Sequence, residues 1–236
     1  MAVSQTIAED ADVGESGPQR GIARHPGLAE EVYEAILARL TALKIAPGAR
    51  ISVDGLAREL NVSQTPVREA LGRLEGEGLV VKTHLIGFSA APQITRQRLD
   101  ELYEFRLLVE PDAARKAVQR LTPKAFQDLE ALAARMAAGR ESDARLRYSA
   151  FARLDAMLHD RIMAIAGNEL VRRMLSHQHT HFHVFRLVFH AKVTEEALEE
   201  HAALLSAFSA GDGDGAAQAM RVHIERSRDR LGPAFA

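Results

Sequence analysis

The sequence predicts a mostly α-helical protein, in which an N-terminal winged helix-turn-helix domain precedes an all-α antiparallel helical bundle. Apolar residues recur at steps of three or four in three blocks between Leu28 and Gly76, which predicts three short helices. Two short apolar runs follow, at residues 79–81 and 88–91, and a glycine turn between them predicts a β-hairpin. Over residues 95–231 only helical periods remain, which predicts the bundle.

The composition is that of an ordinary globular protein of 236 residues, with 47% hydrophobic and 26% charged residues. The absence of cysteine excludes disulfides, a thiolate nucleophile and a zinc site built on cysteine. No apolar stretch reaches the ~18 residues of a membrane-spanning helix, and the N-terminus has no signal-peptide pattern, so we expect a cytoplasmic protein with no membrane partner. The formal net charge of −2 gives no sign of nucleic-acid binding, so a local motif has to supply it.

Three segments are expected along the chain: a disordered tail at 1–27, a winged helix-turn-helix domain at 28–92 and a helical domain at 95–232. The first 19 residues of the tail carry four acidic residues and no Lys or Arg, and such a segment cannot bury a core. Pro111 is expected to kink or break the first helix of the helical domain, and residues 211–215 to form a turn. The helical segments are predicted at 95–119, 123–138, 143–166, 168–189, 194–210 and 215–230.

One face of the helix that starts near Gln64 is a candidate DNA-reading surface. Its apolar stripe points inward, while Thr65, Arg68 and Gly72 share a different face, beside Gln64. Arginine can bind guanine, and glutamine adenine, through paired hydrogen bonds. The hydroxyls of Ser63 and Thr65 suit phosphates.

The predicted hairpin, or wing, places Lys82 and His84 where they can reach the minor groove or the phosphate backbone. The alternative for the whole surface is a solvated helix, because residues 63–78 carry two Arg and three Glu, a net charge of −1. The residues alone leave both interpretations open.

Four side chains of the helical domain are candidate metal ligands. Asp155 and His159 lie four residues apart, on one face of a helix. His201 precedes Gly213 by 12 residues and His223 follows it by 10, so the two lie at nearly the same height on antiparallel helices. One carboxylate and three imidazoles suit a divalent metal, Zn in the first place, with Ni, Mn or Fe as alternatives. Each histidine could instead be a hydrogen-bonded core residue.

Residues 177–183 hold further histidines at alternate positions: His177, His179, His181 and His183. On a helix only residues four apart are neighbours, so we expect one pair to be partly buried and the other solvated, without a second metal site.

The run PGARISVDGLARELNVSQTPVREALGRLEGEGLV resembles the N-terminal domain of the GntR family of bacterial transcription regulators. Residues 99–225 resemble the helical effector domain, called FCD, of its FadR-type branch, through LYEFRLLVEPDAARKAV, LDAMLHDRIMAIAGNEL and EEHAALLSAFSAGDGDGAAQAMRVHI. The resemblance covers about 205 of the 236 residues. It implies a ligand-responsive regulator, acting as a repressor, that binds a palindromic operator in double-stranded DNA as a homodimer. The helical domain then serves for effector binding and dimerisation.

The resemblance also assigns roles in the DNA-binding domain. Ser63, Thr65 and Arg68 match DNA-contacting positions, and Gly87 matches the wing-tip glycine. Gln64 departs from the family, whose members usually carry a basic residue there. This departure should weaken a phosphate or base contact.

In the helical domain all four candidate ligands match the family's metal site, above which many members bind a small carboxylate. Arg106 matches an arginine that faces the same cavity, and Asn168 and Arg186 are further ligand-binding candidates. Two alternatives stay open. Glu110 lies four residues after Arg106 and could form an intrahelical ion pair, and Asn168 could cap the next helix.

A metal-dependent hydrolase built on the same site is the competing interpretation. Such an enzyme needs an open metal position and a general base near the bound water. The sequence has no HExxH motif, and Glu199 and Glu200, beside His201, are expected to point elsewhere on their helix. We therefore expect a regulator and not an enzyme.

Overall fold

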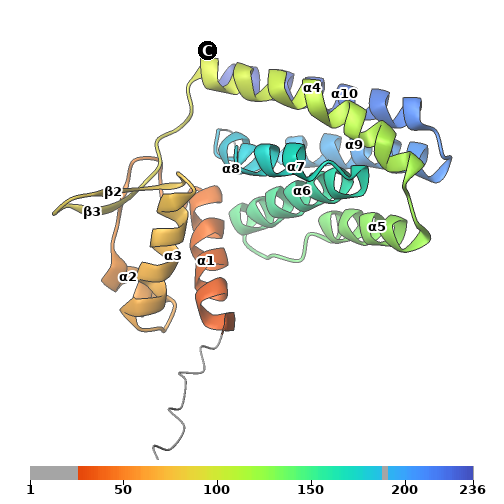
Figure 1. Ribbon diagram of the computed structural model, residues 1–236. Coiled ribbons are helices and arrows are strands. Elements are labelled where there is room, and N and C mark those ends of the chain that lie inside the picture. Colours follow the sequence, from red (N-terminus) through yellow and green to blue (C-terminus); the bar gives the residue numbers. More distant parts are fainter. Residues whose placement is uncertain (1–25, 188–190, 236) are drawn as a thin grey trace, which may run out of the picture.

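The computed structural model describes residues 26–187 and 191–235, which form two units joined by a linker (Figure 1). The expected tail at 1–27 lies outside the described residues except for its last two, which begin the first helix. The protein is mostly helical with one small sheet in its N-terminal unit, as predicted. No helix among the described residues combines the length and the hydropathy that crossing a bilayer requires.

The N-terminal unit is a winged helix-turn-helix domain. Its elements are α1 (Pro26–Thr41), β1 (Arg50–Ile51), α2 (Val53–Glu59), α3 (Gln64–Gly76), β2 (Val80–Thr83) and β3 (Gly87–Ala90). The strands form an antiparallel sheet in the order β1-β3-β2. The sequence does not predict β1, because two residues are too few to show the alternation of a strand.

Individual residues set the start of α2 and the turn between α2 and α3. The Ser52 hydroxyl accepts a hydrogen bond from the Gly55 amide and caps α2. Asn61 follows α2 with a left-handed φ of 53°, a conformation that asparagine tolerates, and so stops the helix. Ser63 occupies the N-cap position of α3, but its side chain makes no capping hydrogen bond. The hydroxyl is therefore not used by the helix.

The C-terminal unit is a helical bundle. Its elements are α4 (Arg96–Gln119), α5 (Pro123–Ala138), α6 (Ala144–Ala166), α7 (Glu169–Ser176), α8 (Thr180–Phe185), α9 (Ala191–Ser209), α10 (Gly213–Leu231) and a final 3-10 helix (Gly232–Phe235). In Figure 1, α4 runs beside α10, and α9 packs against α10 and α5. Helix α4 continues through Pro111 and does not break there. Helix α10 begins inside the expected turn, because Asp212 accepts a hydrogen bond from the Gly215 amide and caps it.

The prediction of one helix over 168–189 is wrong, because the segment holds two short helices. Helix α7 ends at Ser176, and His179 interrupts the path with a left-handed φ of 46° before α8 begins. The interruption also breaks the expected pairing of the histidines four apart. His177 is exposed, whereas His179, His181 and His183 are all partly buried.

The two units meet along α1, α6 and α8. Phe182 of α8 belongs to the bundle by sequence, yet its ring packs in the hydrophobic core of the N-terminal domain. Arg186 follows α8 and donates a 2.7 Å hydrogen bond from Nη2 to the carbonyl of Ala91 in the linker. An exposed ion pair of 3.0 Å joins Lys44 to Asp143 across the same junction. The bundle therefore contributes both packing and hydrogen bonds to the N-terminal domain.

Candidate metal centre and nucleic-acid interface

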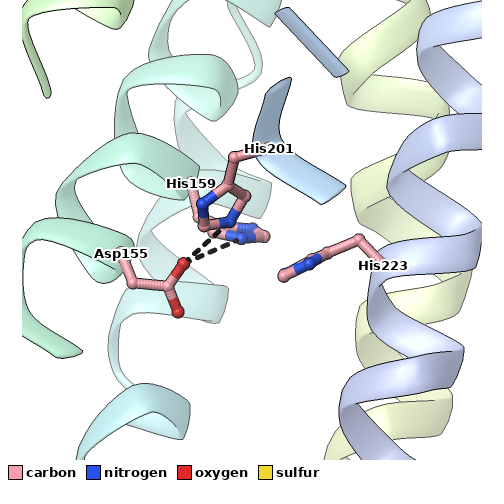
Figure 2. Close-up of side chains that lie close together, drawn as sticks. All are labelled: Asp155, His159, His201 and His223. Carbon is pink, nitrogen blue, oxygen red and sulfur yellow. Dashed lines mark ion pairs between the residues drawn. The ribbon is translucent and has the colours of Figure 1, made fainter. Parts of the chain in front are cut away.

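Asp155, His159, His201 and His223 come together between three helices of the bundle (Figure 2). The first two lie one turn apart on α6, while His201 comes from α9 and His223 from α10. All four are buried, and one ligating atom of each lies within 4.8 Å of the others. Figure 2 shows His223 pointing from α10 toward the other three. The i,i+4 spacing of Asp155 and His159, and the similar distances of His201 and His223 from the turn, bring together the residues that the sequence singles out.

Several ligating atoms of this cluster have no hydrogen-bond partner. Asp155 Oδ1, His159 Nε2 and His201 Nε2 are buried and make no hydrogen bond in the described part of the chain. Asp155 Oδ1 lies at ion-pair distances from the other two, 3.0 Å from His201 Nε2 and 3.7 Å from His159 Nε2. Buried polar atoms are rarely left unsatisfied in native proteins. A cation held between these atoms would satisfy all three.

Two buried carboxylates orient two of the histidines. The Nδ1 of His159 is hydrogen bonded to Glu110 of α4, and the Nδ1 of His223 donates to Glu200 of α9 over 2.8 Å. Both bonds occupy Nδ1 and leave Nε2 for the centre of the cluster. Metal-bound histidines commonly use their second nitrogen in this way, which fixes the tautomer and the ring orientation.

The expectation that Glu200 points elsewhere is therefore wrong, although Glu199 is exposed as expected. Glu200 is 6% exposed, and besides the bond to His223 it accepts bonds of 2.6 and 3.0 Å from Arg230. The sequence could not show this, because the contact depends on the register between α9 and α10.

The electrostatics of the cluster favour the protonation states of metal ligands. Burial alone would raise the pKa of the Asp155 carboxyl, but His181 and His201 beside it hold that pKa well below its usual value. Burial lowers the pKa of His223 to about 4, against the opposing effect of its bond to Glu200. Metal binding requires an ionised carboxylate and neutral imidazoles. The four residues therefore fit a divalent cation.

Arg106 lies beside the cluster, but its guanidinium is paired with Glu110. Its Nε donates to Glu110 Oε1 over 2.5 Å, and its Nη2 lies 3.4 Å from His159 Nδ1. Both partners are 1% exposed, and the positive charge of Arg106 and the His159 bond lower the pKa of Glu110 against the effect of burial. The intrahelical ion pair that the sequence left open is therefore present. Arg106 also lines a small cavity of about 20 Å³ with Asp155 and His223.

The other two ligand-binding candidates make their contacts elsewhere. Asn168 is exposed, and its Oδ1 accepts a 3.2 Å bond from the Val171 amide, so it caps α7. The capping alternative therefore describes its position. Arg186 is buried at the domain junction, where its guanidinium lies over the Phe182 ring, 4.6 Å from the centroid. Burial lowers its pKa to about 10.

His181 is a neighbour of the cluster that the sequence did not identify as one. Its Nε2 lies 3.4 Å from Asp155 Oδ2, and its ring centroid is 5.0 Å from that of His159. The same Nε2 is buried and has no hydrogen-bond partner among the described residues. The break at His179 turns the ring toward the cluster, and nothing in the alternating histidine pattern predicts that break.

The DNA-reading candidates all lie on exposed surface. They are Ser63, Gln64, Thr65 and Arg68 at the start of α3, and Lys82, His84 and Gly87 on the wing. Gly87 has a φ of 107°, which side chains rarely adopt, so glycine suits the start of β3. The face is open at Gly72, where no atom lies within 4 Å of the position that a Cβ would take.

Gln64 connects its two neighbours on this surface. Its amide nitrogen donates to Asp54 of α2, and its amide oxygen accepts a 3.2 Å bond from Arg68 Nη2. Gln64 therefore helps to hold the Arg68 side chain in place, besides any contact of its own with DNA. The sequence indicated the missing charge and a possible base contact at this position, but not the bonds to Asp54 and Arg68.

Replacing Gln64 with arginine is expected to tighten DNA binding and to steepen its salt dependence. One more phosphate contact releases about one more counterion, so the slope of log affinity against log salt should steepen by about 0.9 per added contact. The measurement is the affinity for a palindrome selected in vitro, taken at several salt concentrations. Gln127 is exposed on α5, outside the DNA-reading surface, so Gln127→Arg adds the same charge and should leave the slope unchanged. An identical slope for Gln64→Arg and wild type would show that position 64 does not contact DNA.

Known proteins resemble both halves of the chain. Residues 28–89 match the family described as bacterial regulatory proteins, gntR family, and residues 101–226 match the FCD domain family. The chain is 27% identical to the HTH-type transcriptional regulator McbR of Escherichia coli (strain K12) over 201 residues, which cover 84% of this chain and 90% of that protein. It is 34% identical to the Nta operon transcriptional regulator of Aminobacter aminovorans over 123 residues, 52% of this chain and 56% of that protein.

Two solved structures share the architecture. That of E. coli McbR/YncC superposes with a TM-score of 0.69 at 23% identity, covering 89% of this chain and 99% of that one. A GntR regulator from Rhodococcus sp. RHA1 gives a TM-score of 0.69 at 20% identity, covering 88% of this chain and 99% of that one. Both likenesses support the arrangement of a helix-turn-helix domain followed by a helical bundle.

Proposed function

The chain belongs to the GntR family of bacterial regulatory proteins and carries an FCD domain, and we propose that it is a repressor that responds to a small carboxylate. The relatives named above are transcriptional regulators, and the chain is likewise a transcriptional regulator and not an enzyme. The observation that supports the proposal most is the buried cluster, in which ligating atoms of Asp155, His159 and His201 have no hydrogen-bond partner among the described residues. The hydrolase interpretation has no comparable support.

Asp155, His159, His201 and His223 would hold a divalent metal. Zn suits three imidazoles and a carboxylate, and Ni, Mn or Fe are alternatives that the same donors accept. The bound metal would supply a Lewis-acidic position for one carboxylate oxygen. Arg106, which lines the small cavity at the cluster, would face the same carboxylate and would share its charge with Glu110.

Helix α8 would carry the signal to the DNA-binding domain. His181 contacts Asp155 of the cluster, and the next residue, Phe182, packs in the core of the N-terminal domain. A ligand that prefers one position of α8 would therefore bias the placement of the DNA-binding domain relative to the bundle. In a homodimer such a bias changes the spacing of the two reading helices and thereby the fit to the two half-sites.

A thermal-shift screen of small carboxylates, with and without Zn, tests the sensing proposal. A ligand that binds only the folded state raises the unfolding temperature, by an amount that grows with the logarithm of its concentration relative to its Kd. We expect stabilisation by one class of carboxylate only when Zn is present, and the same compound should lower the affinity for the selected palindrome. A panel in which no compound stabilises the Zn-loaded protein would argue against a carboxylate effector.

Replacing Arg68 with alanine is expected to cost about 1–3 kcal/mol of DNA-binding free energy per half-site and to relax base preference at one position. The reason is that an exposed arginine on the reading face, already held by Gln64, can bind guanine with two hydrogen bonds. The measurement is affinity for the palindrome and for its single-base variants at one salt concentration. Wild-type affinity and preference in Arg68→Ala would remove this residue from the interface.

A further inference from the structure

A cavity of about 550 Å³ lies between the two domains, a size typical of pockets for small molecules. Helix α1 of the N-terminal domain forms one wall, and α6, α7 and α8 of the bundle form the others (Figure 1). Its lining is mainly apolar and includes Ala35, Leu37 and Ala38 of α1 and Ala152, Ala156 and Met163 of α6. A molecule in this cavity would therefore contact both domains at once.

The inner end of this cavity reaches the metal cluster. His159 of the cluster lines it, and so does His181. On the other side, His181 also lines the small cavity of about 20 Å³ that Asp155, His223 and Arg106 border. That volume holds about one water molecule. Among the described residues, the small cavity beside Arg106 therefore has room for a carboxylate oxygen at the metal, whereas the interdomain cavity has room for a larger group.

Polar side chains line the interdomain cavity from both domains, but few of them have atoms free for a ligand. Thr180 is 3% exposed, and neither its Oγ1 nor His181 Nε2 has a hydrogen-bond partner among the described residues. Two arginines that line the cavity are already paired, Arg153 with Glu34 at 3.5 Å and Arg172 with Asp160 at 2.8 Å. Among the described residues, the cavity therefore offers unpaired hydrogen-bonding atoms at Thr180 and His181, while most of its exposed lining is apolar.

We propose that the effector is a monocarboxylate with an apolar body, and that this body lies in the interdomain cavity between α1 and α6. Its carboxylate end would face His181, Thr180 and the metal cluster, while its body would contact Ala38 of α1 and Ala156 of α6. The placement of the carboxylate rests on the proposed function, because it requires the metal site. The placement of the apolar body depends only on the interdomain cavity. The effector would then contact the DNA-binding domain directly as well as through α8.

The test compares acetate with octanoate as probes on protein loaded with Co²⁺, whose visible spectrum reports a carboxylate at the metal. Octanoate should bind at least about tenfold more tightly than acetate, because each buried CH₂ adds about fourfold in affinity. Ala38→Trp fills the cavity from α1, and Ala156→Leu fills it from α6. Two variants in different helices keep the test valid if one of them fails to fold. Both should weaken octanoate by about tenfold or more and leave acetate within twofold. Ala131→Trp, exposed on α5, should change neither.

A neutral dye, N-phenyl-1-naphthylamine, tests the apolar end independently of the metal. Its fluorescence should rise with wild-type protein, fall when octanoate displaces it, and stay low with Ala38→Trp and Ala156→Leu. Wild-type octanoate affinity and dye binding in both filled variants would overturn the proposal. If no carboxylate alters the Co²⁺ spectrum but the filled variants still lose the dye, the carboxylate sensor fails while the interdomain cavity stands as an apolar site.

Discussion

Replacing His201 with alanine is expected to remove the metal from the purified protein, with a loss of Zn affinity of at least about 100-fold. Partners that merely orient metal ligands are worth 10–100-fold in affinity, and His201 would be a ligand itself. It is 1% exposed, and its Nε2 faces Asp155 Oδ1 over 3.0 Å. Metal content after dialysis against a weak chelator measures the effect, and circular dichroism checks the fold.

His177 provides the matched control for this variant. It is an exposed histidine outside the cluster, so His177→Ala should keep full metal content. One metal ion per chain retained by His201→Ala under the same dialysis would exclude His201 from the site. Loss of metal in both variants would point to general unfolding instead.

Replacing Glu110 with alanine is expected to destabilise the metal-free protein by about 3–5 kcal/mol, the cost of leaving one charge of a buried pair without its partner. Arg106 would lose the carboxylate to which its Nε donates, and His159 would lose the bond to its Nδ1. Urea unfolding followed by circular dichroism gives the free energy of unfolding of each variant.

The same helix carries an exposed pair with the same spacing, which serves as the control. Arg96 and Asp100 of α4 lie four residues apart and form a 3.0 Å ion pair whose side chains are about half exposed. Asp100→Ala should cost no more than about 1 kcal/mol, since solvent screens exposed pairs. Equal costs for Glu110→Ala and Asp100→Ala would show that burial of the Arg106–Glu110 pair has no energetic weight. Replacing Arg106 and Glu110 together by apolar residues should recover part of the loss.

Regular spacing explains which parts of the centre could be predicted. Asp155 and His159 are joined by helical periodicity, and His201 and His223 lie at comparable distances from a turn that two antiparallel helices share. Such relations depend on helix geometry alone. They fix the helix face that a side chain occupies and its position along the helix axis. These two properties were sufficient to predict that the four residues lie together.

The parts that could not be predicted depend on register and on irregular backbone. Glu200 reaches His223 only because α9 and α10 pack with one particular rotation about their axes. His181 faces the cluster because His179 adopts a left-handed conformation, for which its neighbours in the sequence provide no glycine or proline signal. Arg186 was expected to bind the ligand, but its guanidinium donates to the Ala91 carbonyl in the linker, a contact that depends on how the two domains pack.

The position of Phe182 limits how freely the two halves can be recombined. Regulators of this architecture invite the construction of chimeras, in which a DNA-binding half is fused to a bundle that senses a different compound. Here the DNA-binding half would lose a ring of its own core, since Phe182 is 7% exposed and belongs to the same hydrophobic cluster as side chains of α1, α2 and α3. Losing a buried aromatic side chain typically costs about 3–5 kcal/mol, a large part of the stability of a small domain. A functional chimera of this protein therefore has to keep α8, or supply an equivalent aromatic residue at that place.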